Sequence, residues 1–111
     1  MPSIKFETSV VLSKEAEQKL ALEIATLASL ELNKPLEVVQ VRIQSAMTVS
    51  FGNSCRTNSA FLHLALIGKI APEVKAELPK KFAALLKEYG VEEKYLFLHY
   101  TETAPDAWGW L

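Results

Sequence analysis

The segment Phe61–Ile67 is apolar on both faces of an extended chain, which restricts the fold more than any other stretch of this sequence. In a strand, successive side chains point to opposite faces. Leu62, Leu64 and Leu66 therefore share one face, and Phe61, Ala65 and Ile67 share the other with His63. A run of this kind predicts a central strand that is covered on both sides.

The first half of the chain predicts a strand, a helix and a second strand. Ser3–Thr8 alternates apolar and polar residues, as half-buried strands do. Ser13 is expected to cap a helix that ends at Asn33, because Pro35 prevents its continuation. Val38–Ile43 then predicts the second strand.

The second half repeats this order after the central strand. Gly68 should end that strand, and Pro72 suits the first position of a helix that Gly90 closes. Pro79 removes a hydrogen bond within this helix, so we expect either a kink or a loose first turn with the regular helix starting near Pro79. Tyr95–Tyr100 predicts the last main strand.

The two halves, about 1–45 and 59–101, thus form an internal repeat within a single domain, 1–111. Each unit places a helix between two strands, and two such β-α-β units predict one four-stranded α/β (α+β) sheet with both helices on one face. Two helices cannot cover both apolar faces of these strands. The other face must be buried by something else, and symmetric self-association is the economical answer.

Composition excludes several classes of protein. The 111 residues are half apolar and carry a formal net charge of −1, so the chain can build a core and has no basic surface for nucleic acid. No apolar run is long enough to cross a membrane, and the N-terminus does not have the pattern of a secretory signal.

Met47–Phe51 predicts a short third strand that leads into a polar loop, 52–58. Cys55, the one cysteine, falls in this loop, cannot form an internal disulfide and is interpreted as a passive thiol. His63 is interpreted as a hydrogen-bonded core or interface residue, since no second histidine nearby in the sequence supports a metal site.

Pro2 becomes chemically unusual if Met1 is removed. Its nitrogen is then a secondary amine that accepts a proton near neutral pH, and a strand that starts here would hold the amine in place. Proline at position two is ordinary when taken alone. Lys34 is likewise usually solvated in such a position, and Trp108 is as consistent with interface packing as with a pocket.

Four features taken together resemble the macrophage migration inhibitory factor family of tautomerases over essentially the whole chain. These are Pro2 at the start of a strand, Asn33-Lys34-Pro35 after the first helix, Ile67-Gly68-Lys69-Ile70 at the end of the central strand, and Trp108-Gly109-Trp110 in the tail, Thr101–Leu111. The resemblance implies a homotrimer in which three sheets surround a central barrel. It also implies sites at the subunit boundaries that interconvert keto and enol forms of phenylpyruvate-like or dopachrome-like compounds without a cofactor or metal.

The resemblance also assigns roles to single positions. Pro2 matches the catalytic proline, Lys34 the lysine that meets the substrate carboxylate, Ile67 the residue whose backbone contacts it, and Trp110 the tryptophan at the rim. From the neighbouring subunit, Phe97 falls where many members have tyrosine and His99 where many have asparagine. The redox CxxC of some members is absent, because 56–61 reads RTNSAF.

These residue types suit a proton transfer next to a carbonyl. A general base works best with a pKa near the working pH, and an α-amine starts near 8. Apolar walls from Phe97, Trp108 and Trp110 and the charge of Lys34 are expected to lower the pKa of the Pro2 amine. Lys34 is also expected to attract an acidic substrate, a small aromatic keto acid.

Two other functions remain open on the sequence. One is a cytokine-like binding protein that meets a cell-surface receptor and whose pocket serves recognition. The other is a trimeric scaffold with a vestigial site. The expected location is the cytoplasm, with secretion without a signal peptide as the alternative.

Overall fold

The computed structural model describes residues 1–110, so the last residue of the predicted tail, Leu111, lies outside the described part. Its main elements are β1 (Ser3–Thr8), α1 (Lys14–Leu32), β2 (Gln40–Gln44), β3 (Val49–Phe51), β4 (Ser54–Arg56), β5 (Ala60–Ile67), α2 (Pro72–Lys87) and β6 (Leu96–Thr103). Three short 3₁₀ turns, η1 (Leu36–Val38), η2 (Glu93–Tyr95) and η3 (Pro105–Ala107), connect or follow them. Within this part of the chain, neither helix combines the length and the apolar character needed to span a membrane.

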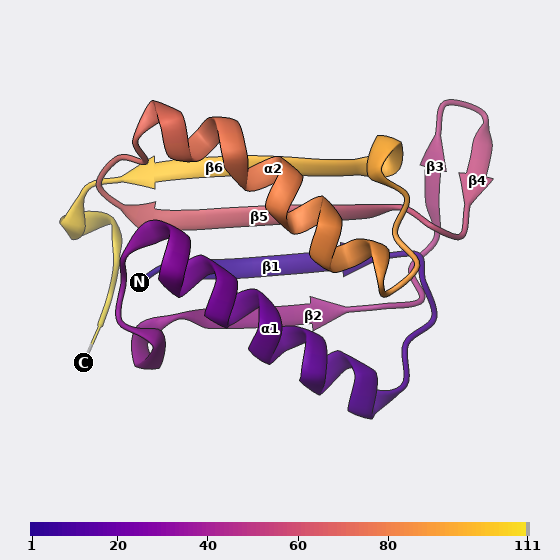
Figure 1. Cartoon of the computed structure of the whole chain (residues 1–111), viewed down its shortest axis with the longest axis horizontal. Helices are drawn as coiled ribbons and strands as arrows, with labels where there is room; N and C mark the ends of the chain where they lie inside the picture. The colour runs from indigo at the N-terminus through magenta and orange to yellow at the C-terminus, as the bar shows by residue number, and fades with distance from the viewer. Residues whose placement is uncertain (111) are drawn as a thin grey trace.

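The main sheet has the predicted two-unit topology. Its order is β2-β1-β5-β6, with β1 parallel to β2, β5 parallel to β6, and the two inner strands antiparallel. Both helices lie on the same face of this sheet, and both termini lie at the edge where β5 and β6 end (Figure 1). The predicted fold of two β-α-β units is therefore confirmed.

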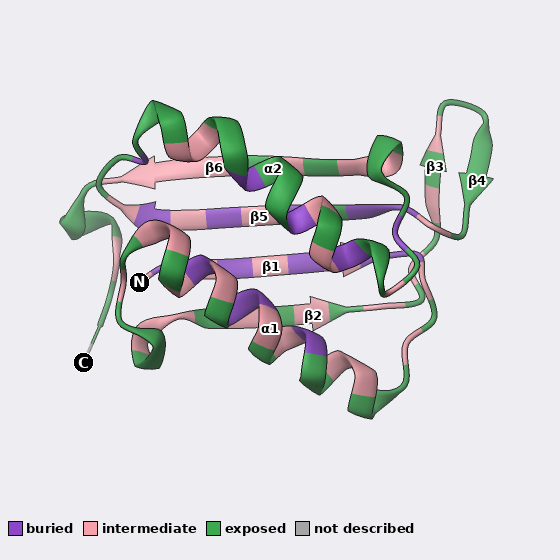
Figure 2. Cartoon of the chain, viewed as in Figure 1, coloured by how far each residue is buried: buried purple, intermediate pink, exposed green. Residues whose placement is uncertain are grey.

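The core lies between the sheet and the two helices. The residues that form it include Ile4, Phe6, Leu62 and Leu64 of the inner strands and Leu20, Ile24, Leu78 and Phe82 of the helices, all fully buried. Neither helix covers the opposite face of the sheet, and along β1 and β5 buried residues alternate with more exposed ones (Figure 2). On this open face Phe61 is 38% exposed and Phe97 57% exposed.

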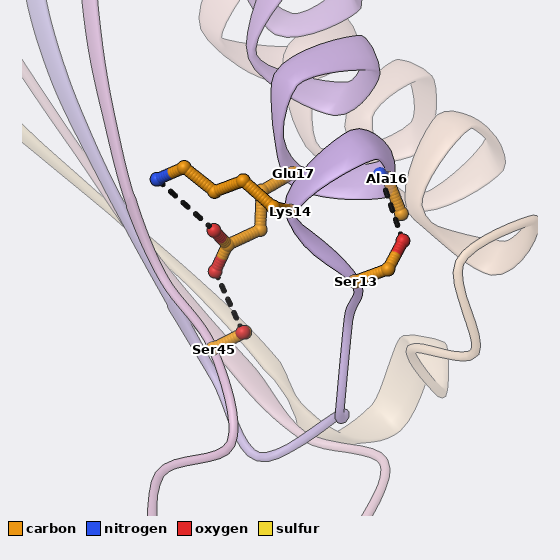
Figure 3. A network of polar contacts seen from close by, with 5 residues as sticks. All are labelled: Ser13, Lys14, Ala16, Glu17 and Ser45. Atoms are coloured by element: carbon orange, nitrogen blue, oxygen red, sulfur yellow. Dashed lines mark hydrogen bonds and ion pairs between the residues drawn. The ribbon is translucent and has the colours of Figure 1, made fainter.

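Helix α1 begins and ends as its sequence predicts. The Ser13 hydroxyl accepts a hydrogen bond from the Ala16 amide at 3.1 Å, and the Glu17 carboxylate accepts one from Ser45 at 2.7 Å (Figure 3). Asn33 ends the helix in the left-handed conformation, with φ 53°. The first-turn contacts hold the start of α1, and the left-handed residue Asn33 ends the helix.

Three predicted strands start later than the sequence suggests. Strand β3 begins at Val49 rather than Met47, and each of the other two begins after a local turn. The Val38 amide donates to the Pro35 carbonyl and the Val39 amide to Leu36, so this segment forms a 3₁₀ turn and β2 begins at Gln40. Tyr95 likewise belongs to η2, and the last strand runs from Leu96 to Thr103. In both places a local turn satisfies backbone groups before the ladder begins.

Of the hairpin between β2 and β5, the sequence analysis predicted only the first strand. The polar loop 52–58 contains strand β4, which pairs antiparallel with β3 across Gly52, whose φ is 61°. All three residues of β4 are exposed, so no apolar alternation marks it in the sequence.

Helix α2 starts at Pro72 as predicted and continues through Pro79, so the alternative of a loose first turn is wrong. The helix ends at Lys87, with Glu88 as its cap, and Gly90 follows with φ 91°. Gly90 was predicted at the first position beyond the cap, and it lies at the second.

Candidate active site at the N-terminal edge of the sheet

Pro2 is fully buried directly before β1, an inner strand of the sheet. Its carbonyl accepts a hydrogen bond from the Gln40 amide at 3.0 Å, and the Met1 amine donates to the Val38 carbonyl at 2.9 Å. These contacts extend the β1–β2 pairing to the end of the chain. The predicted anchoring of the terminus by a strand is therefore confirmed.

A cavity of about 280 Å³ opens beside Pro2. Its lining comes from the N-terminal segment, from the turn before β2, and from the C-terminal segment that holds Trp108 and Trp110. Three of the predicted site residues, Pro2, Trp108 and Trp110, thus meet in one cavity, although 106 positions separate the first two along the chain (108 − 2). Trp110 is 60% exposed, and its role at the rim of a site stays a prediction.

Thr103 holds Trp108 in place, and the sequence analysis did not identify it. The Trp108 ring nitrogen donates to the Thr103 hydroxyl at 2.6 Å, and that hydroxyl donates to the Leu66 carbonyl at 2.7 Å. The Gly68 amide donates to the Thr103 carbonyl at 2.9 Å. One threonine at the end of β6 therefore ties Trp108 to the end of β5, but a threonine in a strand is too common to signal this role.

Lys34 is held by the end of α1. Its amide donates to the Ser29 carbonyl at 3.1 Å, and its own carbonyl accepts from the Ser29 hydroxyl at 2.6 Å. The side chain lines a second cavity of about 270 Å³, together with Lys69 and Ile70, rather than the cavity beside Pro2. Its charge still reaches the N-terminus: the pKa of the Met1 amine is lowered, first by burial and then by the Lys34 ammonium.

The other predicted residues lie apart from Pro2 within one chain. Ile67 ends β5 but is not among the residues that line either cavity. Phe97 lines a cavity of about 300 Å³ with Phe51 and Phe61, near the start of β6 and thus at the opposite end of the strands. The analysis expected Phe97 and His99 to act on a neighbouring subunit, and a single chain leaves that expectation as a prediction.

His63 is hydrogen-bonded, as interpreted from the sequence. Its Nε2 lies 2.7 Å from the Thr101 hydroxyl, and its ring stacks on that of His99 with centroids 5.1 Å apart. Burial lowers the pKa of His63, with smaller contributions from His99 and Arg42. Over residues 1–110, no group of three or more His, Cys, Asp or Glu side chains is arranged to hold a metal ion.

The fold and this edge together define a class: small α+β proteins built from two β-α-β units, with a buried proline before an inner strand. The family model described as Macrophage migration inhibitory factor (MIF) matches residues 1–111. The chain therefore belongs to the macrophage migration inhibitory factor family.

Solved structures of the family superimpose closely on this fold. MIF2 of Leishmania major is 25% identical, with a TM-score of 0.84 over 99% of this chain and 93% of its own. The MIF-like protein of Entamoeba histolytica is 21% identical, with a TM-score of 0.89 over 99% and 95%. The factor from Trichinella spiralis is 25% identical, with a TM-score of 0.83 over 97% and 95%. A comparison with curated protein sequences finds no match.

Proposed function

We propose that this protein is a keto–enol tautomerase of phenylpyruvate-like or dopachrome-like compounds, with Pro2 as its general base once Met1 is removed. The observation that carries the proposal is the position of Pro2: it is buried before an inner strand, beside a cavity with two tryptophans and within reach of the Lys34 charge. The family to which the chain belongs supports the same class of isomerase.

The proposed base needs a free nitrogen. With Met1 attached, the Pro2 nitrogen is an amide and cannot take up a proton. After Met1 is removed, the amine forms in the same buried surroundings, where burial and the Lys34 ammonium already lower the pKa of the Met1 amine. Both effects favour the neutral amine, which is the form that acts as a base.

The reaction then proceeds in two proton transfers. The Pro2 nitrogen takes the proton from the carbon next to the substrate carbonyl, and the electron pair of the broken C–H bond forms an enolate. The protonated Pro2 then returns the proton to the enolate oxygen, which gives the enol. In this proposal the substrate carboxylate points towards Lys34 and the end of β5 at Ile67, and the aromatic ring lies against Trp108 and Trp110.

The complete site in this proposal belongs to a homotrimer. Phe97 and His99 sit on the open face of the sheet, away from Pro2 of their own chain. They are proposed to reach the Pro2 cavity of the adjacent copy, where Phe97 adds an apolar wall and His99 a hydrogen-bonding ring. Self-association would also cover the open face.

A cytokine-like binding protein, with a possible cell-surface receptor, is the second candidate. In a chain that still carries Met1, the acylated Pro2 shapes the cavity but cannot perform the proton transfer, so such a form would act only by binding. In this alternative the cavity beside Pro2 recognises a ligand or partner without turnover.

A phenylpyruvate assay separates the two candidates. The first residue of each preparation is verified by intact mass, and the Met1-free chain is compared with Pro2→Gly, which keeps a free terminal amine but loses the ring. We expect roughly a hundredfold lower kcat/KM for Pro2→Gly, the usual contribution of a positioned general base. Equal rates would remove Pro2 from the mechanism. Lys34→Ala should chiefly raise KM, because it removes a charge that meets the substrate carboxylate.

A further inference from the structure

The ring of Phe97 packs against Phe51, which lies on the β3–β4 hairpin. The two ring centroids are 5.4 Å apart and the rings stand at 60°, an edge-to-face arrangement that aromatic pairs favour. Phe61, the register partner of Phe97 on β5, lines the same cavity of about 300 Å³. The Phe97 ring thus has aromatic neighbours on β5 and on the hairpin, and it stays 57% exposed in the single chain.

Phe51 is itself held beside the start of β6. Its ring centroid lies 5.0 Å from that of Tyr95, and the Arg56 guanidinium lies 4.5 Å from the Tyr95 ring centroid. Phe51 comes from β3 and Arg56 from β4, so both strands of the hairpin contact Tyr95. The two strands form a small sheet of their own, and such a pair is marginally stable in water without further packing. These contacts therefore tie the hairpin to the segment that carries Phe97.

The hairpin lies beyond the end of the main sheet, at the edge opposite the two termini (Figure 1). Phe97 is close to this edge, near the start of β6. In the proposed homotrimer, Phe97 meets the Pro2 cavity of the adjacent copy. The hairpin that packs against Phe97 then belongs to the surroundings of a site on another copy.

Packing alone can select the orientation of the Phe97 ring, because phenylalanine has no polar atom to hold it. Without the ring of Phe51, the side chain of Phe97 would have more than one staggered rotamer open to it. A substrate that packs against Phe97 would then have to order the ring on binding, and that ordering lowers the affinity. The contact with Phe51 removes this cost in advance.

We propose that Phe51 is a positioning residue for the Pro2 site of the adjacent copy, where it fixes the Phe97 ring against the aromatic ring of the substrate. This inference rests on the proposed function, and it makes the β3–β4 hairpin a determinant of specificity for aromatic keto acids. Phe51 acts through Phe97 and takes no part in the proton transfer. Its loss should therefore affect the binding of the substrate rather than the chemical step.

Calorimetric titration of the Met1-free chain with 3-phenylpropanoate tests the proposal without turnover. This acid has the ring and the carboxylate of phenylpyruvate but no keto group. Phe51→Leu should weaken its binding roughly three- to tenfold, the range expected when one side chain must be ordered on binding. Phe51→Tyr keeps the ring and should restore the wild-type affinity. Tyr89→Leu is the matched control, because it removes another half-buried ring that packs against the core next to α2.

A double-mutant cycle shows whether Phe51 acts through Phe97. In a chain that already carries Phe97→Leu, adding Phe51→Leu should cause little further loss, because the ring that Phe51 positions is absent. With phenylpyruvate as substrate, Phe51→Leu should raise KM and leave kcat nearly unchanged. Sedimentation velocity verifies that each variant keeps the wild-type assembly. Phe51→Met takes the place of Phe51→Leu if the latter dissociates, because methionine adapts to fill the gap without supplying a ring.

Three results would overturn the proposal: an unchanged affinity for 3-phenylpropanoate in Phe51→Leu, an equal loss in Tyr89→Leu, or additive losses in the cycle. Absence of 3-phenylpropanoate binding to the wild type would overturn it as well. Because the titrations need no turnover, they separate this inference from the proposed activity. The expected titrations without turnover of phenylpyruvate would contradict the tautomerase and support the role of Phe51.

Discussion

Removal of Met1 changes the chemical state of the buried Pro2 ring. Its nitrogen is an amide while Met1 is attached and an amine afterwards. Two hydrogen bonds hold the terminus: the Met1 amine donates to the Val38 carbonyl, and the Gln40 amide donates to the Pro2 carbonyl. Only the first is lost when Met1 is removed, and the β1–β2 pairing continues through the second. We therefore expect the ring to stay in place while its nitrogen changes from an amide to a base.

His63 makes the stability of the fold depend on pH. An unfolded histidine titrates near 6.5, and burial, followed by His99 and Arg42, lowers the pKa of His63 in the folded chain. Below about pH 6.5 the unfolded chain therefore binds more protons, so the free energy of unfolding falls as the pH drops through this range and is independent of His63 above it.

The His63→Gln variant tests this at the residue scale. Glutamine can still hydrogen-bond to Thr101 but does not titrate. We expect urea denaturation near pH 7.5 and near pH 5.5 to show a smaller loss of unfolding free energy in the variant than in the wild type, at one fixed protein concentration. Identical losses would show that His63 does not carry the effect.

At the scale of an element, the Ser13 cap anchors the start of α1. Its hydroxyl satisfies the Ala16 amide, which otherwise has no partner within the helix. Ser13→Ala should lower the free energy of unfolding by about 1 kcal/mol. Ser50→Ala, at an exposed position of β3, is the control and should change it little. A Ser13→Ala variant as stable as the control would mean that the cap contributes nothing measurable.

The elements that could be predicted carry strong local signals. Ser13, Asn33 and Pro72 mark helix ends through capping and backbone geometry. The apolar patterns of the four main strands and the two helices between them predict the observed sheet. Strand β4 could not be predicted because all of its residues are exposed. The start of β2 was placed too early because Val38 is apolar, although Pro35 begins a local turn there.

The candidate site could be predicted only in part. Pro2, Trp108 and Trp110 were chosen on a family resemblance, and they line one cavity. The role of Thr103 depends on β5 and β6 ending together, which brings its hydroxyl to Leu66 and to Trp108. No spacing in the sequence contains that information, because it arises from the sheet.

For the molecule as a whole, the open face of the sheet is the main unexplained surface. Phe61 and Phe97 are adjacent in the register and partly exposed there, and Phe51 of the hairpin packs against Phe97. Burying such rings in an assembly is favourable. We expect sedimentation equilibrium to give three times the 12.4 kDa mass of one chain.

Phe97→Glu should weaken this assembly by about 2 kcal/mol or more per contact, because it removes buried apolar surface and adds a charge. Leu22→Glu is the matched control, since Leu22 is 71% exposed on the helix side of the molecule. A wild-type mass of one chain, or equal masses for Phe97→Glu and wild type at all concentrations, would contradict the trimer.

The most direct test of the account compares two forms of the unaltered chain, with and without Met1, each verified by intact mass. Both contain every side chain of the site and differ at the Pro2 nitrogen. We predict phenylpyruvate tautomerisation by the Met1-free form and, relative to it, a loss of at least roughly a hundredfold in the Met1-bearing form. Equal activity in the two forms would show that the Pro2 amine is not the base.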